Sequence, residues 1–117
     1  MIGTDIVKIS RISSIKEKFG EKFLNRIVNK KEKKFIKTDE NLAGIYAAKE
    51  AAVKALGVGI SKFCDFKDIK IFKNSNNKPI IKFSKKVKKY FKIKNADVSI
   101  SHDGGFAIAI VAIKYKK

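Results

Sequence analysis

Two carboxylates and a lysine, far apart in the chain, have the residue types needed for phosphate chemistry assisted by a divalent cation. Asp5 lies in an isoleucine-rich segment, where a carboxylate is a poor strand former and is costly to bury without a partner. Glu50 and Lys54 are four residues apart, so on a helix they would share one face. Two carboxylates without clustered His or Cys favour Mg²⁺, which takes one or two protein carboxylates and shares the phosphates of a substrate. Lys54 would add positive charge for those phosphates.

Each of these residues also has a purely structural interpretation. A Glu and a Lys four residues apart stabilise a helix by a few tenths of a kcal/mol (~0.3) without any functional role. Asp5 could equally be a turn residue held by local backbone donors. Ala43 and Ala47 share the helix face of Glu50 and Lys54, and their small side chains would let another group approach the helix closely.

The chain contains one histidine and one cysteine, His102 and Cys64. A lone histidine cannot build a zinc site, so the default for His102, which precedes an Asp-Gly-Gly turn, is a hydrogen-bonding loop residue. A lone cysteine can form neither an intrachain disulfide nor a cysteine-based zinc cluster, which favours a reducing compartment. We expect a cytoplasmic protein.

Hydrophobic periodicity indicates which elements position these residues. We expect an opening strand over Met1 to Ile9 and an amphipathic helical region from Arg11 to about Lys37, interrupted at Gly20. Asn29 with Glu32 resembles a capping box within that region. The clearest element is a helix from Asn41 to Leu56, which Gly57 and Gly59 should end.

The second half of the chain predicts strands with one short helix. The expected strands are Lys67 to Lys73, Pro79 to Phe83, Ala96 to Ser101 and Phe106 to Ile113, with a short helix capped by Ser84 between the second and third. This order predicts an α+β fold in which antiparallel strands pack with one long helix and several short ones. The length of 117 residues and the absence of a linker predict one domain over 1–117.

The charge balance restricts the partners. With 28 Lys plus Arg against 11 Asp plus Glu, the net charge is +17, which attracts anionic molecules. Only Arg11 and Arg26 are arginines, which disfavours sequence-specific base recognition; much of the lysine excess could equally be solvated surface. The longest apolar run, Phe106 to Ile113, is too short to span a membrane, and the N-terminus lacks the pattern of a secretion signal.

Four blocks of the chain resemble, in order, the signatures of the holo-acyl-carrier-protein synthases, a group within the 4′-phosphopantetheinyl transferase family. They are Gly3 to Val7, Phe23 to Glu32, Ala47 to Ile60 and Ser101 to Ala107. Two positions depart from the family pattern. The pair Ile45-Tyr46 stands where the family usually has Arg-Phe, and Asn77 replaces the glycine of a Gly-Lys-Pro turn.

This resemblance implies a specific reaction. The family transfers the 4′-phosphopantetheine group of coenzyme A to a serine of apo acyl carrier protein, releases adenosine 3′,5′-bisphosphate, and serves fatty acid biosynthesis. The resemblance implies that Asp5 and Glu50 hold Mg²⁺. It places Asp5, Lys54, Gly57 and His102 at the coenzyme A site, and Glu50, Lys54 and His102 among the catalytic residues. Glu50, or a metal-bound water beside it, could accept the serine proton.

The resemblance also implies partners. Arg11, Lys22 and Arg26 would dock the acidic carrier protein, and the small bacterial members of the family are homotrimers with active sites between subunits. Such an arrangement would explain the alanine-rich face of the helix. No nucleic acid and no membrane span are expected.

Two alternatives from other classes are kept. A small basic nucleic-acid-binding protein would use lysines on phosphates and aromatic rings for stacking, independently of Glu50. An assembly subunit would form a trimer without binding coenzyme A.

Overall fold

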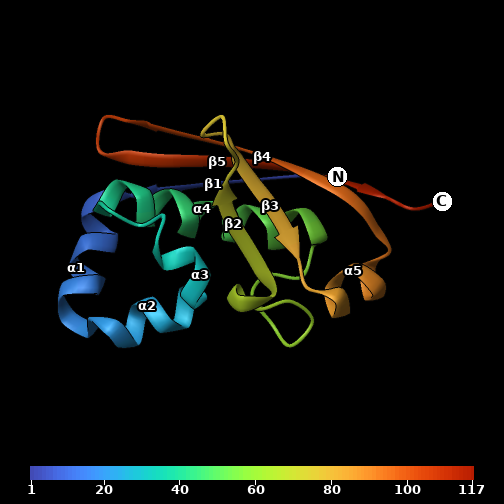
Figure 1. Cartoon of the computed structure of the whole chain (residues 1–117), viewed down its shortest axis with the longest axis horizontal. Helices are drawn as coiled ribbons and strands as arrows, with labels where there is room; N and C mark the ends of the chain where they lie inside the picture. Colours follow the sequence, from blue (N-terminus) through green and yellow to red (C-terminus); the bar gives the residue numbers. More distant parts are fainter.

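The computed structural model describes all 117 residues, and Figure 1 shows its elements in the colours of the chain. They are β1 (Ile2–Lys8), α1 (Ile9–Phe19), α2 (Glu21–Ile27), α3 (Lys30–Lys33), α4 (Asp39–Leu56), a 3-10 turn (Phe66–Asp68), β2 (Ile69–Lys73), β3 (Pro79–Phe83), α5 (Lys85–Phe91), β4 (Ile93–Asp103) and β5 (Phe106–Tyr115). The α+β class and the antiparallel strands expected from the sequence are confirmed.

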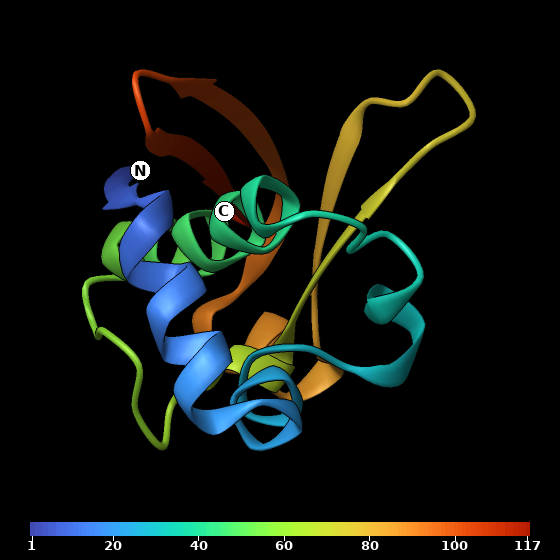
Figure 2. The same ribbon diagram turned by 90° about the vertical axis from the view of Figure 1, so that its left-hand side faces the viewer.

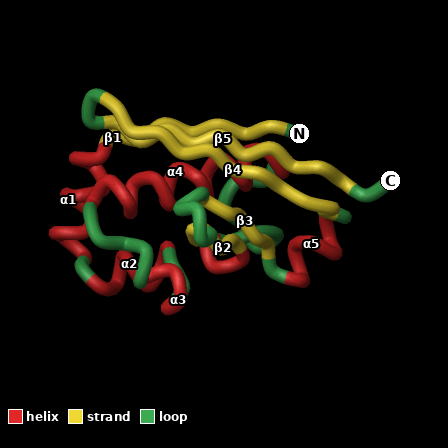
Figure 3. Tube along the Cα trace, turned by 45° about the horizontal axis from the view of Figure 1, so that its top comes forward, coloured by secondary structure: helices red, strands yellow, loops and turns green.

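Three long strands form the main sheet, in the order β1-β5-β4. Side chains alternate between its two faces, as in any strand. One face carries buried residues (Gly3, Val7, Ala107, Ala109, Val111), whereas the other carries exposed isoleucines (Ile2, Ile6, Ile108, Ile110). Figures 1 and 3 show the helices and the second sheet on a single side of these strands. The main sheet therefore has one core face and one open face.

Helix α4 lies against the core face and runs through the middle of the molecule. Its first turn is capped by Thr38, whose side chain accepts the Asn41 N–H at 3.1 Å, so the helix begins at Asp39, two residues earlier than predicted. Gly57 ends it as predicted, with a left-handed φ of 77° and an N–H that donates to the carbonyls of Lys54 and Val53.

The alanine-rich face of α4 is occupied by the chain's own sheet. Ala43 and Ala47 are 0% exposed, and a Cβ at Gly3 would overlap the carbonyl oxygen of Ala51. The interpretation of these alanines as room for a ligand or a neighbouring subunit is therefore wrong. They are small because β1 and β5 pack directly on the helix.

The helical region before α4 consists of three short helices. Gly20 separates α1 from α2 with a φ of 55°, a conformation that strongly favours glycine. The capping box at Asn29 and Glu32 is confirmed at the start of α3. Figure 2 shows α3 beside the β2–β3 hairpin, with α1 on the opposite side of the view.

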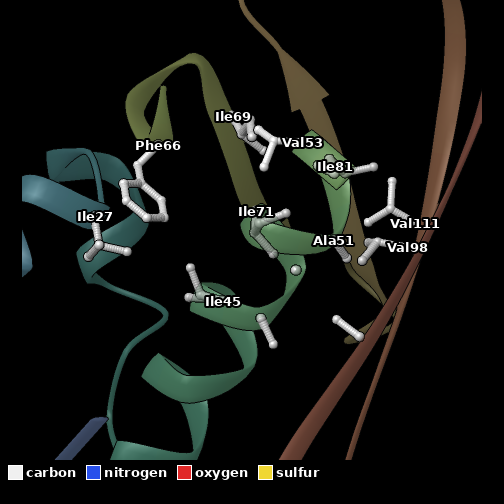
Figure 4. Close-up of a cluster of buried hydrophobic side chains, with 14 of the residues drawn as sticks. Ile27, Ile45, Ala51, Val53, Phe66, Ile69, Ile71, Ile81, Val98 and Val111 are labelled. Atoms are coloured by element: carbon white, nitrogen blue, oxygen red, sulfur yellow. The ribbon is translucent and has the colours of Figure 1, made fainter. Parts of the chain in front are cut away.

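The hairpin of β2 and β3 forms a separate two-stranded sheet that covers another side of α4. Its turn contains Asn77 at φ 63°, which asparagine tolerates better than most residues. Ile71 and Ile81 of the hairpin, Ile45 and Val53 of α4, and Val111 of the main sheet belong to one buried cluster (Figure 4). The helix thus links both sheets into one core.

Several strand boundaries differ from the sequence prediction; β1 is one residue shorter at each end, and β5 continues to Tyr115. β2 begins at Ile69 rather than Lys67, because Phe66–Asp68 form a 3-10 turn capped by Asp65. β4 extends from Ile93 to Asp103, because its pairing with β5 continues to Asp103 opposite Phe106. His102 is consequently a strand residue, not a loop residue. No helix is both long and apolar enough to cross a membrane.

Candidate active site

Asp5 and Lys54 meet, although they are 49 positions apart in the chain. Asp5 faces α4 from the middle of β1, and its Oδ1 accepts a hydrogen bond from Lys54 Nζ at 2.7 Å. The side chain of Asp5 is 14% exposed and that of Lys54 is 53% exposed. The pair therefore sits at the edge of the core, where a ligand can reach the ammonium group.

Glu50 joins this pair one turn before Lys54 on α4. Burial raises the pKa of the Glu50 carboxyl, and the nearby negative charge of Asp5 raises it further, while Tyr46, Lys54 and Arg11 act in the opposite direction. The effect of Asp5 on Glu50 places the two carboxylates in one neighbourhood. Glu50 has no ion pair of its own.

Tyr46 and Arg11 complete the surroundings of Glu50. Tyr46 is half-buried, its ring lies 5.7 Å from that of Phe66, and its pKa is raised by burial and then by Glu50. Arg11 is exposed at the start of α1, and its positive charge lowers the pKa values of both Glu50 and Tyr46. Sequence reasoning placed neither residue at the acidic pair. The position of Tyr46 four residues before Glu50 was a signal for it.

Lys49, which directly precedes Glu50 on α4, is fully buried. Lys49 Nζ donates to Glu32 Oε1 at 2.9 Å and to the carbonyls of Ile27 and Phe66 at 2.7 and 3.0 Å. Glu32 Oε2 accepts the N–H of Ile71 at 2.9 Å. We call this set of contacts the Lys49–Glu32 network. It was not predicted from the sequence, because the acceptors of Lys49 come from segments distant in the chain.

His102 lies apart from the acidic pair within one chain. Its Nε2 is 2.8 Å from the carbonyl oxygen of Glu40, and it contacts the Gly44 position in the first half of α4. β4, which carries His102, and β1, which carries Asp5, are opposite edges of the main sheet. His102 lines a separate cavity of about 240 Å³ with Lys73, Asn77 and Phe72. Within this chain, the cavity of His102 is therefore not lined by Asp5, Glu50 or Lys54.

The remaining predicted site residues, Gly57 and the three basic residues, differ in exposure and in their contacts. Gly57 acts as the helix cap described above and has open space beside it. Lys22 is exposed on α2 without an ion pair. Arg26 is held by Asp65 at 2.7 Å and lies 5.2 Å from the Phe66 ring centroid, with 54% of its side chain still exposed. Arg11, Lys22 and Arg26 all belong to the α1–α2 segment, which is far from α5 in Figure 1.

The donor set around Asp5 fits a magnesium ion. Two carboxylates approach each other without any His or Cys, and oxygen-only sites with few protein ligands suit Mg²⁺, which keeps several waters. No group of three or more His, Cys, Asp or Glu residues forms a cage for a metal. The two acids would leave positions free for phosphate oxygens.

Comparison with known proteins identifies the family. The family model described as the 4′-phosphopantetheinyl transferase superfamily matches residues 1–111. The chain belongs to this superfamily. The holo-[acyl-carrier-protein] synthase of Campylobacter lari is 58% identical over 114 residues, covering 97% of this chain and 98% of that protein.

Solved structures agree with this membership in the superfamily. The Helicobacter pylori holo-[acyl-carrier-protein] synthase, determined in complex with coenzyme A, has a TM-score of 0.95 and 46% identity over 97% of this chain and 100% of that one. The Neisseria meningitidis synthase has a TM-score of 0.88 and 32% identity over 97% and 96% of the two chains. The family and the enzyme class expected from the sequence, a phosphopantetheinyl transferase, are confirmed.

Proposed function

We propose that this phosphopantetheinyl transferase moves the 4′-phosphopantetheine group of coenzyme A to a serine of apo acyl carrier protein in the cytoplasm, for fatty acid biosynthesis. The observation that carries the proposal is the convergence of Asp5, Glu50 and Lys54 at the edge of the core. The relatives named above act on acyl carrier protein, and one of them binds coenzyme A.

The reaction exchanges one phosphorus–oxygen bond for another. The serine oxygen forms a bond to the phosphorus that carries the pantetheine arm, and adenosine 3′,5′-bisphosphate leaves with the electron pair of the broken bond. Phosphoryl transfer of this kind depends on positioning and charge neutralisation rather than on covalent help from the protein. The exposed ammonium group of Lys54 supplies such charge beside the diphosphate.

Asp5 and Glu50 would hold Mg²⁺, which when bound neutralises phosphate charge and orients the diphosphate. The serine must also lose its proton. We assign the acceptor role to Glu50, because Asp5 is already engaged by Lys54 whereas Glu50 has no ion pair. The hydrogen bond from Lys54 also fixes the orientation of the Asp5 carboxylate.

We further propose a homotrimer with active sites between subunits. Two observations support it. The open face of the main sheet exposes Ile2 (73%), Ile6 (59%) and Ile110 (48%), an apolar surface typical of an interface. His102 also lies away from Asp5 within one chain, so a second copy would have to bring a His102 cavity next to the acidic pair. Ile6→Lys should give a folded monomer in light scattering that lacks activity; a folded, active monomer would contradict this assembly.

Mass spectrometry tests the reaction directly. Apo acyl carrier protein incubated with the enzyme, coenzyme A and Mg²⁺ should gain the mass of one phosphopantetheine group, and chelation of the metal should prevent the gain. Asp5→Ala and Glu50→Ala should abolish it, whereas the matched substitution Glu17→Ala, on the exposed surface of α1, should not. If both site variants modified the carrier protein at the wild-type rate, the assignment of this site would be wrong.

A further inference from the structure

The α5 end of the molecule concentrates positive charge outside the active site. Residues 82–94 contain seven lysines and no acidic residue. The only ion pair among these lysines is Lys86 with Asp68 at 3.5 Å, and Lys86 stays 64% exposed. The charge is therefore available to an anionic partner.

The lysines of α5 form an outward-facing surface. Val87 is buried and Phe91 is half-buried, so this side of the helix anchors it, whereas Lys85, Lys88 and Lys89 are exposed on the other side. The chain end adds to the surface, because the N–H of Lys116 donates to the carbonyl of Lys92 at 2.8 Å and places the C-terminal lysines beside it.

One flank of this surface has a hollow of about 250 Å³ between β3, α5 and β4. The polar residues that line the hollow are Lys82, Lys88, Lys94 and Asn95, and no acidic residue lines it. Lys88 and Lys94 bring positive charge to this hollow, whereas Lys82 Nζ lies 5.8 Å from the centroid of the Phe72 ring, which does not line it. A hollow with this charge suits a phosphate group. None of Asp5, Glu50, Lys54 or His102 takes part, so the hollow is separate from the proposed active site.

The other flank carries exposed aromatic rings. Tyr90 is 61% exposed and Phe63 is 38% exposed. The two rings stack at 5.4 Å, and Lys62 lies 5.3 Å from the Phe63 ring centroid. Because the two rings stack on each other, each has only one face free for stacking on a nucleotide base, whereas two separate rings would have more. Tyrosine and phenylalanine beside lysines are typical of surfaces that lie at the lipid–water boundary.

We propose that the α5 surface, meaning the exposed side chains of α5 with Lys82, Lys94 and Phe63, binds the surface of a membrane rich in anionic phospholipids. The hollow accepts a headgroup phosphate, the α5 lysines contact further headgroups, and Phe63 and Tyr90 enter the boundary region. Clusters of several lysines on a helix with adjacent apolar groups bind anionic lipid in this way. The contact is peripheral, since no helix can cross a membrane.

The position of the surface is compatible with simultaneous binding of a carrier protein. α5 and α1 lie at opposite ends of the molecule in Figures 1 and 3. A protein bound to lipid through α5 would therefore leave α1 at the end of the molecule away from the membrane. This inference is independent of the proposed reaction.

Vesicle co-sedimentation of the full chain tests the proposal. The protein should sediment with vesicles of phosphatidylcholine and phosphatidylglycerol, and not with phosphatidylcholine alone. The binding should weaken strongly at about 0.5 M salt, where the Debye length falls to a few Å. Lys88→Glu/Lys89→Glu should weaken binding by about tenfold or more, since each lysine near an anionic surface contributes.

A control variant distinguishes the effect of this particular surface from the effect of a change in the net charge of the protein. Lys31→Glu/Lys34→Glu makes the same change in charge on exposed residues of the α3 region, and should retain most of the vesicle binding. Phe63→Ser should weaken binding without changing its salt dependence. Circular dichroism verifies that each variant is folded.

Three outcomes would overturn the proposal. The first is absence of binding to anionic vesicles. The second is equal binding by the Lys88→Glu/Lys89→Glu and Lys31→Glu/Lys34→Glu variants. The third is tighter binding to a single-stranded oligonucleotide than to anionic vesicles at the same total phosphate concentration and salt. The last would assign the surface to nucleic acid. Activity on soluble carrier protein should be unchanged in Lys88→Glu/Lys89→Glu, so failure here is distinguishable from failure of the proposed reaction.

Discussion

Neighbouring residues of α4 belong to two acid–lysine sites with opposite properties. Lys49 and Glu32 are 0% and 2% exposed, and the ammonium group of Lys49 has three acceptors. Lys54 and Asp5 share one hydrogen bond, with Lys54 53% exposed, and Glu50 beside them has no ion pair. A structural site satisfies every polar group, because an unsatisfied buried charge is costly. A site that binds a substrate leaves some charged groups without a partner in the protein, so that they can contact the substrate.

The largest expected effect is on the Lys49–Glu32 network. Lys49→Met should lower the free energy of unfolding by about 3–5 kcal/mol, because it leaves Glu32 buried without a countercharge. Urea denaturation measures the loss. Lys54→Met, the same substitution at the exposed lysine, should cost less than about 1 kcal/mol. Similar losses from the two variants would remove the distinction between the sites.

The second prediction concerns activity, for which the exposed Lys54 should matter although it matters little for stability. Lys54→Met should lower kcat/KM by about a hundredfold, equivalent to about 2.7 kcal/mol, while unfolding hardly changes. The reason is that the charge of Lys54 acts on substrate phosphates rather than on the core. Steady-state kinetics with apo carrier protein gives the value. A variant that lost stability and rate in proportion would assign Lys54 a structural role.

The third prediction concerns an intermediate case, the exposed ion pair of Arg26 and Asp65. Arg26→Glu should raise KM for carrier protein by about tenfold, because it places a negative charge on a surface that meets acidic helices, and should leave KM for coenzyme A unchanged. Asp65→Asn is the control: it releases Arg26 but keeps an oxygen for the N–H of Phe66, which Asp65 accepts at 2.8 Å. Its KM for carrier protein should not rise. An unaltered KM in Arg26→Glu would exclude Arg26 from docking.

The smallest effect is expected at Asp39, which joins α1 to the first turn of α4. Hydrogen bonds from Ser13 and Lys16 lower the pKa of its carboxyl below its ordinary value. A lowered folded pKa means that Asp39 contributes stability above its ordinary pKa and loses it as the pH falls through the lowered value. Asp39→Asn should therefore destabilise by less than about 1 kcal/mol at neutral pH.

The pH dependence provides the check for Asp39. The difference between wild type and Asp39→Asn in thermal or urea unfolding should shrink as the pH falls from the ordinary pKa of an aspartate through the lowered pKa of the folded protein, because the wild-type carboxyl then becomes protonated too. A difference that stayed constant through this range would mean that the charge of Asp39 has no part in its contribution.

Much of the fold could be predicted from local patterns. The break at Gly20, the capping box at Asn29 and the end of α4 at Gly57 were all predicted, because these signals act within a few residues. Strand ends were predicted less well. β4 continues through His102 because its partner β5 offers hydrogen bonds that far, and this depends on a segment that follows it in the chain.

The site was predicted in part. The expectation that Asp5 and Glu50 form one metal site came from a resemblance rather than from spacing, and it stays a prediction. The buried state of Lys49 could not be predicted, because its acceptors come from residues 22, 17 and 17 positions away. The environment of the alanines was misread, since a small residue is equally suited to an open pocket and to a closely packed sheet.

The sequence by itself determined the helix and strand order, the i, i+4 relation of Glu50 and Lys54, and the family to which the chain belongs. These depend on local periodicity and on motifs of adjacent residues. The tertiary structure decided which of two neighbouring residues, Lys49 and Glu50, is buried in a saturated network and which faces Asp5 at the edge of the core. The rotation of α4 about its own axis determines which of the two residues is buried. This rotation depends on contacts between segments that are distant in the chain.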